Sequence, residues 1–484
     1  MEAIRESIRA MSPDADDSTD QMDTPAASLR SDVRAWPGFL VAVVLVVVAA
    51  AAGFLAHTPG LNGYEGLWAW PWRMLPWSPL YPLLLLGAVP VFLAHGALAR
   101  GKTTTGKALA LLVIGNLGLQ IFLCGSQSDP FSLDRIWQTV ASPESTGYFT
   151  DAIRLTRIPG WMSSYPQLLS QLTLHSSTKP PGYLLYYMFF VEVFGERTGA
   201  FWGGLTTGFL GALAVPATYW LARTYKVQKE GAFHAACLIA FAPGLLLFFP
   251  GFDQILAAVA CLQLAVWREL LERKSATLAV AFGAIVFLTT FFTYSLLVLG
   301  VFIVLWLARQ LRERPDEAGP IAVRVALAVL VFVALNLALW AIVHFQPIET
   351  FRAAVAEQQA FAATRPTTFW RTVPMDVYQG AMGAGFVLVV ALVYRFSILF
   401  GAEPSGPLER PFLVIALVQI AVVAVSMLLA IETTRLWIFL IPLVAIPAGC
   451  EVARRPPEER WAALLAQLVL VGVTCQTMVF LRPT

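Results

Sequence analysis

Charged side chains are scarce in this sequence. Of its 484 residues, 13% are Asp, Glu, Lys or Arg, against about 25% in a typical soluble domain, and 57% are hydrophobic. The apolar residues form long runs rather than an amphipathic pattern, which excludes a soluble globular domain and predicts an all-α polytopic membrane protein. The net charge of +2 gives no indication of nucleic-acid binding.

Cysteine and histidine are also rare, with five of each. The cysteines are odd in number, lie in or beside apolar runs and have no zinc-type spacing with histidine. This pattern predicts reduced, buried thiols rather than a disulfide framework or a zinc site. The residues are Cys124, Cys237, Cys261, Cys450 and Cys475.

The N-terminal residues 1–35 are polar and acidic, with eight Asp or Glu residues against four Arg. This composition predicts a disordered cytoplasmic tail. The first apolar run begins only near Pro37, so no secretory signal peptide is expected, and Arg30 and Arg34 lie just before that run.

The apolar runs predict about thirteen transmembrane helices, several of them shorter than the ~20 residues that cross a bilayer comfortably. The run at 276–308 is too long for one helix, and it is divided at the aromatic residues 291–294. The expected spans are 38–56, 79–98, 106–124, 200–222, 232–249, 255–268, 276–290, 294–308, 324–344, 380–400, 412–430, 436–450 and 461–481.

Lys and Arg in the short loops predict the orientation of the chain in a cytoplasmic (inner) membrane, with the N-terminus inside and the C-terminus outside. The outer face then carries 57–78, 125–199, 250–254, 345–379 and 432–435. The apolar stretch 181–195 cannot cross the membrane in this topology, and its many aromatic residues predict a helix in the outer interface. A second surface helix is expected at 350–364, and the Trp-rich stretch 57–78, which includes Trp77, is interpreted as an interfacial belt.

The longest polar interval of the apolar part, 125–182, contains two groups suited to catalysis or binding. A helix that starts near Ser145, next to Glu144, would place Tyr148 and Asp151 on nearby faces, and a carboxylate there can accept a proton from a hydroxyl nucleophile. The alternative is an N-cap at 144–146 and a solvated Asp151. Further on, His175 and Lys179 precede two prolines and a helix N-terminus, a place that favours anions, although both can also be ordinary surface side chains.

Two short turns on the same predicted face carry further candidates. Asp253 and Gln254 lie between two apolar runs, where the acid can bind a metal or a substrate hydroxyl or can simply cap the next helix. Glu432 and Arg435 flank another turn, and the guanidinium group is suited to phosphate, although the two residues can also form a local ion pair. The predicted topology does not depend on these residues, yet it places all four groups on one face.

The order of these motifs resembles the GT-C superfamily of membrane glycosyltransferases, particularly the protein O-mannosyltransferases and the lipid A aminoarabinose transferase. The resemblance covers roughly 106–310 and rests on short motifs: an acid-bearing first outer loop, Lys179-Pro-Pro-Gly-Tyr and Asp253-Gln254. Glu144 matches the acid position of the family, but Ser145 stands where the family has a second acid. Asp151 and, third, Asp129 are therefore competing candidates.

The resemblance implies a fold and a reaction. A catalytic core at 106–310 would follow two extra spans at 36–105 and precede a helical part at 311–484. The enzyme would move a sugar, with inversion, from a polyprenyl-phosphate donor to a lipid, glycan or protein acceptor outside the cytoplasmic membrane.

The resemblance also implies roles for the candidate residues. Lys179, Arg435 and His175 would stabilise the departing phosphate, and Glu144 or Asp151 would deprotonate the acceptor. Substrate binding is expected from Tyr148, His175, Lys179, Asp253, Gln254, Glu432 and Arg435. A divalent cation is compatible with this chemistry but is not required.

Other classes of protein remain open on the sequence alone. A lipid-linked polysaccharide ligase also needs outer Arg and His residues. A multi-span transporter or flippase would place its charges near the bilayer midplane, whereas the inner parts of these predicted spans hold almost no ionisable residues. A non-catalytic membrane scaffold is a further alternative.

Overall fold

A computed structural model describes residues 38–64, 68–75, 83–365, 367–401 and 406–483. The described chain is an assembly of helices with one two-stranded antiparallel sheet, formed by β1 (Gly63–Tyr64) and β2 (Trp68–Ala69). The long apolar helices confirm an all-α, membrane-embedded protein. The acidic tail 1–35 and Trp77 lie outside the described residues.

The α-helices begin and end as follows: α2 Phe39–Leu55, α3 Leu83–Ala99, α4 Thr105–Ser126, α5 Asp134–Ala141, α6 Tyr148–Thr156, α7 Tyr165–Leu168, α8 Leu174–Ser177, α9 Gly182–Phe194, α10 Glu196–Ala212, α11 Ala214–Thr224, α12 Lys229–Ala240, α13 Pro243–Leu246, α14 Ile255–Glu272, α15 Ala276–Phe292, α16 Gly300–Glu313, α17 Ala318–Val343, α18 Pro347–Ala363, α19 Phe369–Ala384, α20 Phe386–Arg395, α21 Glu409–Ser426, α22 Thr433–Leu436, α23 Ile441–Arg454 and α24 Pro457–Thr477. Short 3₁₀ helices connect them: η2 Leu169–Gln171, η3 Phe252–Gln254, η4 Ser295–Leu299, η5 Pro315–Glu317, η6 Phe396–Phe400 and η7 Ile438–Leu440.

The structure does not confirm thirteen spans. Among the described residues, six helices are long and apolar enough to cross a membrane, or seven if α19 and α20, bent by 104° at their junction, form one broken span. The count falls because several apolar runs fold as shorter helices; the run 232–249, for example, is broken between α12 and α13. The division of 276–308 is confirmed, since α15 ends at Phe292 and η4 begins at Ser295.

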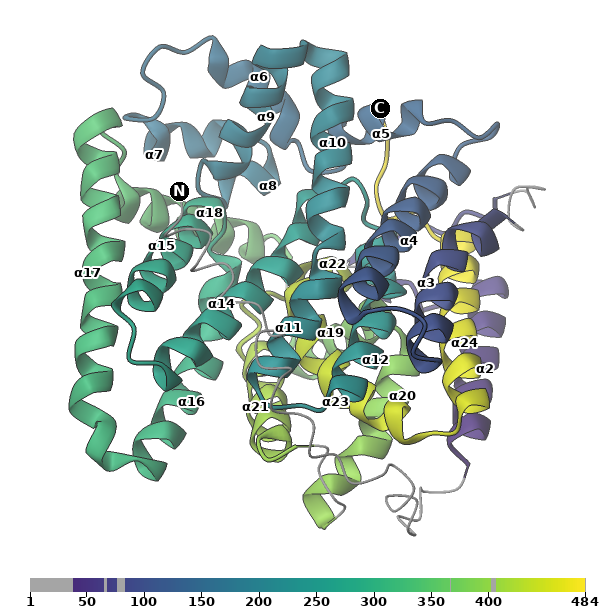
Figure 1. The fold of residues 1–484 in the computed structure, drawn as a ribbon. Helices are drawn as coiled ribbons and strands as arrows, with labels where there is room; N and C mark the ends of the chain where they lie inside the picture. Colours follow the sequence, from purple (N-terminus) through teal and green to yellow (C-terminus); the bar gives the residue numbers. More distant parts are fainter. Residues whose placement is uncertain (1–37, 65–67, 76–82, 366, 402–405, 484) are drawn as a thin grey trace.

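The first long polar segment expected on the outer face lies at one end of the helical assembly. Helices α5 to α9 lie together there, whereas the turn between α16 and α17, with its arginines, lies at the opposite end (Figure 1). The predicted surface helices are present as α9 and α18, and α18 packs against α7 and η2. The two long polar segments therefore meet in space, although they are far apart in sequence.

A buried ion network joins three helices near their ends, near or beyond the ends of the predicted spans. Arg395, at the end of α20, donates from Nε to Glu409 Oε1 at 2.5 Å, and both side chains are almost completely buried. Glu451 of α23 lies 3.8 Å from the same guanidinium. Because removing one partner would leave a buried charge uncompensated, this network fixes how α20, α21 and α23 pack.

Candidate active site

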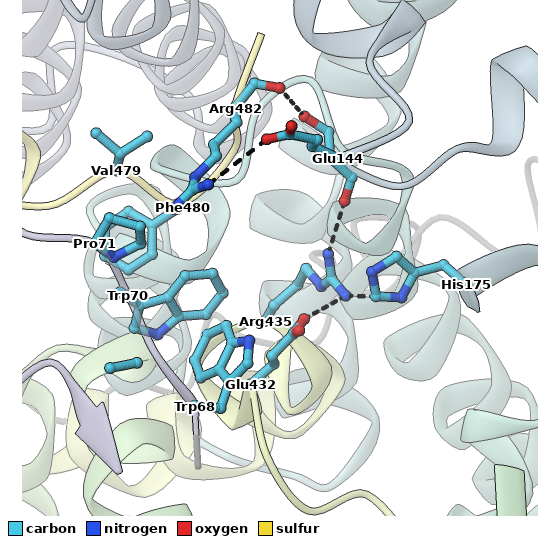
Figure 2. A pocket seen from close by; sticks show the side chains of 12 residues that line it. Trp68, Trp70, Pro71, Glu144, His175, Glu432, Arg435, Val479, Phe480 and Arg482 are labelled. Carbon is cyan, nitrogen blue, oxygen red and sulfur yellow. Dashed lines mark hydrogen bonds and ion pairs between the residues drawn. The ribbon is translucent and has the colours of Figure 1, made fainter. Parts of the chain in front are cut away.

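The predicted polar groups converge on one buried guanidinium, that of Arg435 in α22. Its Nη2 lies 2.5 Å from Glu432 Oε2 and 3.3 Å from His175 Nδ1. Its Nε lies 3.4 Å from Asp253 Oδ2, and Nη1 donates to the Ser145 carbonyl at 3.4 Å. Figure 2 shows this guanidinium between Glu432, His175 and the Glu144–Ser145 segment. Four segments from different parts of the chain thus share one cation.

Arg435 stays charged in this setting. Burial by itself would lower the pKa of its guanidinium, but the carboxylates of Glu432 and Asp253 outweigh that effect and raise the pKa above its usual value. An arginine that keeps its charge and presents a planar fork of donors is suited to bind phosphate.

His175 is neutral and has a defined tautomer. Arginine can only donate hydrogen bonds, so His175 Nδ1 must be the acceptor, and the ring proton is on Nε2. Burial, together with the nearby cations Arg435, Lys179 and Arg365, holds the pKa of His175 well below 6.5. The imidazole is therefore a hydrogen-bond donor through Nε2 and not a general base.

Lys179 is positioned next to these groups by the start of α9. Its Nζ donates to Ser295 Oγ at 2.9 Å, and its carbonyl accepts from Tyr165 Oη at 3.0 Å. Gly182, three residues on, packs so closely that a Cβ would lie 2.6 Å from the Phe291 carbonyl oxygen. Burial lowers the pKa of the Lys179 ammonium, as does Arg435, although Asp253 opposes the shift. Lys179 is half-buried, and no carboxylate of the described residues forms an ion pair with it, so this cation is suited to an anionic ligand.

A strained turn presents Glu432 to the site. Both Ile431 (φ 68°) and Glu432 (φ 56°) are in the left-handed region, which is unfavourable above all for a β-branched residue. Asp376 of α19 holds the turn, because its Oδ1 accepts from the Ile431 N–H at 3.0 Å and its carbonyl accepts from Thr433 Oγ1 at 2.8 Å. Sequence reasoning missed Asp376, since nothing in its local sequence distinguishes it from other helical acids.

Two cavities meet at His175, Glu432 and Arg435. The first, here called the polar cavity, has a volume of about 400 Å³. The second, called the apolar groove, has a volume of about 380 Å³ and runs along α18 and η4. The polar cavity is lined by Trp68, Ala69, Trp70, Pro71, Glu144, Ser145, Val479, Phe480 and Arg482 in addition to the shared residues. The apolar groove is lined mainly by apolar side chains, together with the cations Lys179 and Arg365. The three shared residues therefore lie between a polar compartment and an apolar one.

Glu144 lines the polar cavity from its rim. It is exposed, and its Oε2 lies 3.6 Å from Nη1 of Arg482, which is exposed as well. The neighbouring Ser145 Oγ donates to the Arg482 carbonyl at 2.6 Å, which ties the C-terminal segment to this loop. Glu144 is therefore accessible to a molecule that enters the polar cavity.

Four predicted site residues line neither cavity: Tyr148, Asp151, Asp253 and Gln254. Tyr148 is 2% exposed, its ring lies 4.7 Å from that of Tyr183, and burial raises the pKa of its hydroxyl well above 10. Asp151 Oδ2 accepts from both the backbone N–H and Oγ1 of Thr173, at 2.9 and 2.6 Å. Gln254 is buried, and its amide donates to the Leu245 carbonyl. Their observed contacts hold the loops in place.

The start of α6 corrects one local prediction. The helix begins at Tyr148 rather than near Ser145, because Gly147 precedes it in the left-handed region (φ 71°), and no side chain caps it. Asp253, proposed as an alternative helix cap, makes no capping hydrogen bond and pairs with Arg435 instead. Asp129, the third acid considered, is exposed and lines neither cavity.

Within the described ranges, no group of three or more His, Cys, Asp or Glu side chains is arranged to hold a metal ion. All five cysteines are free and buried, as predicted. No protein-family model matches the chain, and no curated protein matches it.

Proposed function

We propose that the protein is a membrane glycosyltransferase that moves a sugar from a polyprenyl-phosphate donor to an acceptor. The observation that carries this proposal is the meeting of the apolar groove and the polar cavity at Arg435, Glu432 and His175. A reaction between a lipid-linked donor and a polar acceptor needs such a junction, because the two substrates approach from environments of opposite polarity.

The apolar groove is proposed to hold the donor. Its lining includes side chains of α18 and of 428–431, which suit a hydrocarbon chain, and the cations Lys179, Arg365 and Arg435 suit the phosphate. With Glu432 and Asp253 ionised, the three cations exceed these two carboxylates by one positive charge. A phosphodiester with a single negative charge would neutralise that excess.

The chemistry is a single displacement. The acceptor hydroxyl forms a bond to the anomeric carbon from the face opposite the phosphate, while the bond from that carbon to the phosphate oxygen breaks. The electron pair leaves on the phosphate, where Arg435 and Lys179 stabilise it, and the hydroxyl proton passes to a carboxylate. The products are the glycosylated acceptor, with inverted configuration, and the polyprenyl phosphate.

Among the candidate bases, Glu432 is the one whose position supports proton transfer best. It lines both cavities, and the strained turn orients its carboxylate toward their junction. Glu144 lines only the polar cavity and is proposed to orient the acceptor, while the Asp151 carboxylate already accepts two hydrogen bonds from Thr173.

The proposed topology places the end of the molecule with α5 to α9 outside a cytoplasmic membrane and the N-terminus inside. The clustering of the polar segments at that end and of the α16–α17 turn at the other supports it (Figure 1).

A transfer assay in reconstituted vesicles tests the function. Vesicles with the purified protein receive radiolabelled polyprenyl-phosphate hexoses and a membrane extract as the source of acceptor. We expect label to leave the lipid with wild type, to remain on it with Glu432→Gln, and to move more slowly with Glu144→Gln. Asp151→Asn and a surface control, Arg197→Lys, are expected to retain transfer. If the intact lipid-linked sugar instead changes leaflet, the protein is a flippase.

A further inference from the structure

We propose that the polar cavity is a carbohydrate-binding site and that the acceptor is therefore a glycan, with the indole of Trp68 as the platform for a sugar ring. The assignment as acceptor rests on the proposed function, whereas binding of a carbohydrate does not. The proposal follows from the different chemistry of two parts of the lining of this cavity (Figure 2).

One wall is a cluster of aromatic rings packed edge to face or tilted against one another. The ring centroids of Trp68 and Trp70 lie 4.2 Å apart at 85°, and those of Trp70 and Phe480 lie 4.9 Å apart. Trp70 is 3% exposed and packs on Phe248 from behind, whereas Trp68 is only partly buried. Trp68 is thus a rigidly supported indole that lines the polar cavity, an arrangement suited to the apolar face of a sugar ring.

The backbone around Trp68 is fixed independently of any ligand. Trp68 pairs with Tyr64 in the β1–β2 sheet, and Asn62 both donates to and accepts from the backbone of Trp70, at 2.7 and 2.8 Å. Val479 N–H donates to the Pro71 carbonyl at 3.1 Å, so the C-terminal segment closes the same wall. The platform is therefore pre-organised, which lowers the entropic cost of binding.

The rest of the lining carries groups that match sugar hydroxyls. The carboxylates of Glu144 and Glu432 accept hydrogen bonds, and the guanidinium groups of Arg435 and Arg482 donate them. His175 adds a donor through Nε2. A hydroxyl both donates and accepts, so a saccharide can satisfy both kinds of group at once.

Other acceptor classes fit this lining less well. A lipid chain would exclude water from the charges of Glu144, Glu432 and Arg435 without offering them any hydrogen bond in return. A peptide bound as an extended strand would draw its affinity from main-chain hydrogen bonds along a sheet edge, and this cavity is lined by side chains from five separate segments instead. The volume of about 400 Å³ lies within the ~300–1,000 Å³ typical of small-ligand sites, which is enough for a glycan terminus.

The test measures binding without a donor. Fluorescently labelled protein in lipid nanodiscs is applied to an array of immobilised glycans, with Ser/Thr-rich peptides on the same array. We expect wild type to bind a subset of the glycans, Trp68→Ala to lose at least ten-fold in apparent affinity, and Trp68→Phe to retain part of it. Trp202→Ala, at an exposed tryptophan of α10, is the matched control and is expected to bind as wild type does.

Binding that is absent for every glycan, that survives Trp68→Ala unchanged, or that occurs only to the peptides would overturn the proposal. Folding of each variant is checked by its thermal transition in detergent, so that a loss counts only in a folded protein. Glycan binding that depends on Trp68, in a protein that transfers no sugar, would leave this proposal standing while the transferase function fails.

Discussion

Arg435 Nη2 lies 2.5 Å from Glu432 Oε2, and this pair marks the junction of the polar cavity and the apolar groove. The two residues are three positions apart: Glu432 immediately precedes the short helix α22, and Arg435 lies within it. Because Asp376 fixes the turn that carries them, the cation for the phosphate and the carboxylate for the acceptor proton are held in one rigid unit.

Replacing Arg435 tests the cation. In Arg435→Lys the charge is kept but the fork of donors is lost, so we expect the transfer rate to fall about 100-fold, equivalent to about 3 kcal/mol of transition-state stabilisation. Rates are measured at saturating donor in vesicles. Arg197→Lys, at an exposed ion pair with Asp134, is the control and should change the rate less than two-fold. An unchanged rate in Arg435→Lys would remove Arg435 from the chemistry.

Replacing Asp376 tests the strained turn. In Asp376→Ala the Ile431 N–H loses its acceptor, and we expect about 1–3 kcal/mol of destabilisation and reduced transfer. Asp376→Asn keeps an oxygen acceptor and should be milder in both respects. The thermal midpoint in detergent and the transfer rate are measured together. Asp316→Ala, at an exposed position in η5, is the control, and an equal effect there would contradict a specific role for Asp376.

Replacing Asp151 tests whether its carboxylate is structural or catalytic. Because Asp151 Oδ2 accepts two hydrogen bonds from Thr173, Asp151→Asn is expected to retain one acceptor, to fold, and to transfer within a few-fold of wild type. Asp151→Ala should instead lower the thermal midpoint. A well-folded Asp151→Asn protein without transfer would show that Asp151, and not Glu432, takes the proton.

The lowered pKa of His175 predicts that the stability of the protein depends on pH. Its folded-state pKa is well below 6.5, whereas the unfolded chain binds the proton near 6.5. The unfolded state therefore binds more protons as pH falls below 6.5, and stability decreases there by at most about 1.4 kcal/mol per pH unit for this one group. Above pH 6.5 the contribution of His175 is constant.

The measurement compares thermal unfolding of wild type and His175→Asn between pH 5 and pH 8. The difference in thermal stability between wild type and variant should be independent of pH above 6.5. Below pH 6.5 this difference should narrow or reverse, because the variant lacks the titration of His175. A difference that is independent of pH would mean that His175 is not held neutral in the folded protein.

The long helices, and the residues that come together at the site, could be predicted from the sequence. Apolar runs predicted most of the long helices, and the positions of Lys and Arg predicted one common face for Glu144, His175, Asp253 and Arg435, which the structure brings close together. The number of spans was not accessible, because hydropathy measures apolar content and not where a helix breaks, as at the junction of α12 and α13.

The roles of individual acids and the two cavities also required the structure. Asp151 and Glu432 are both acids near a predicted turn, and only their partners, Thr173 in one case and Arg435 in the other, distinguish them. Trp68 and Phe480 lie at opposite ends of the sequence, so their shared wall depends on a long-range contact that no local pattern encodes.

The most direct test of the central claim follows the anomeric carbon itself. Wild-type protein in vesicles is supplied with a polyprenyl-phosphate hexose labelled with ¹³C at C1, and the phosphorus-coupled C1 resonance is followed by NMR. The account predicts that this resonance disappears, and that an uncoupled resonance of inverted configuration replaces it, with wild type but not with Glu432→Gln or Arg435→Lys. Persistence of the coupled resonance with folded wild-type protein and acceptor present would contradict it.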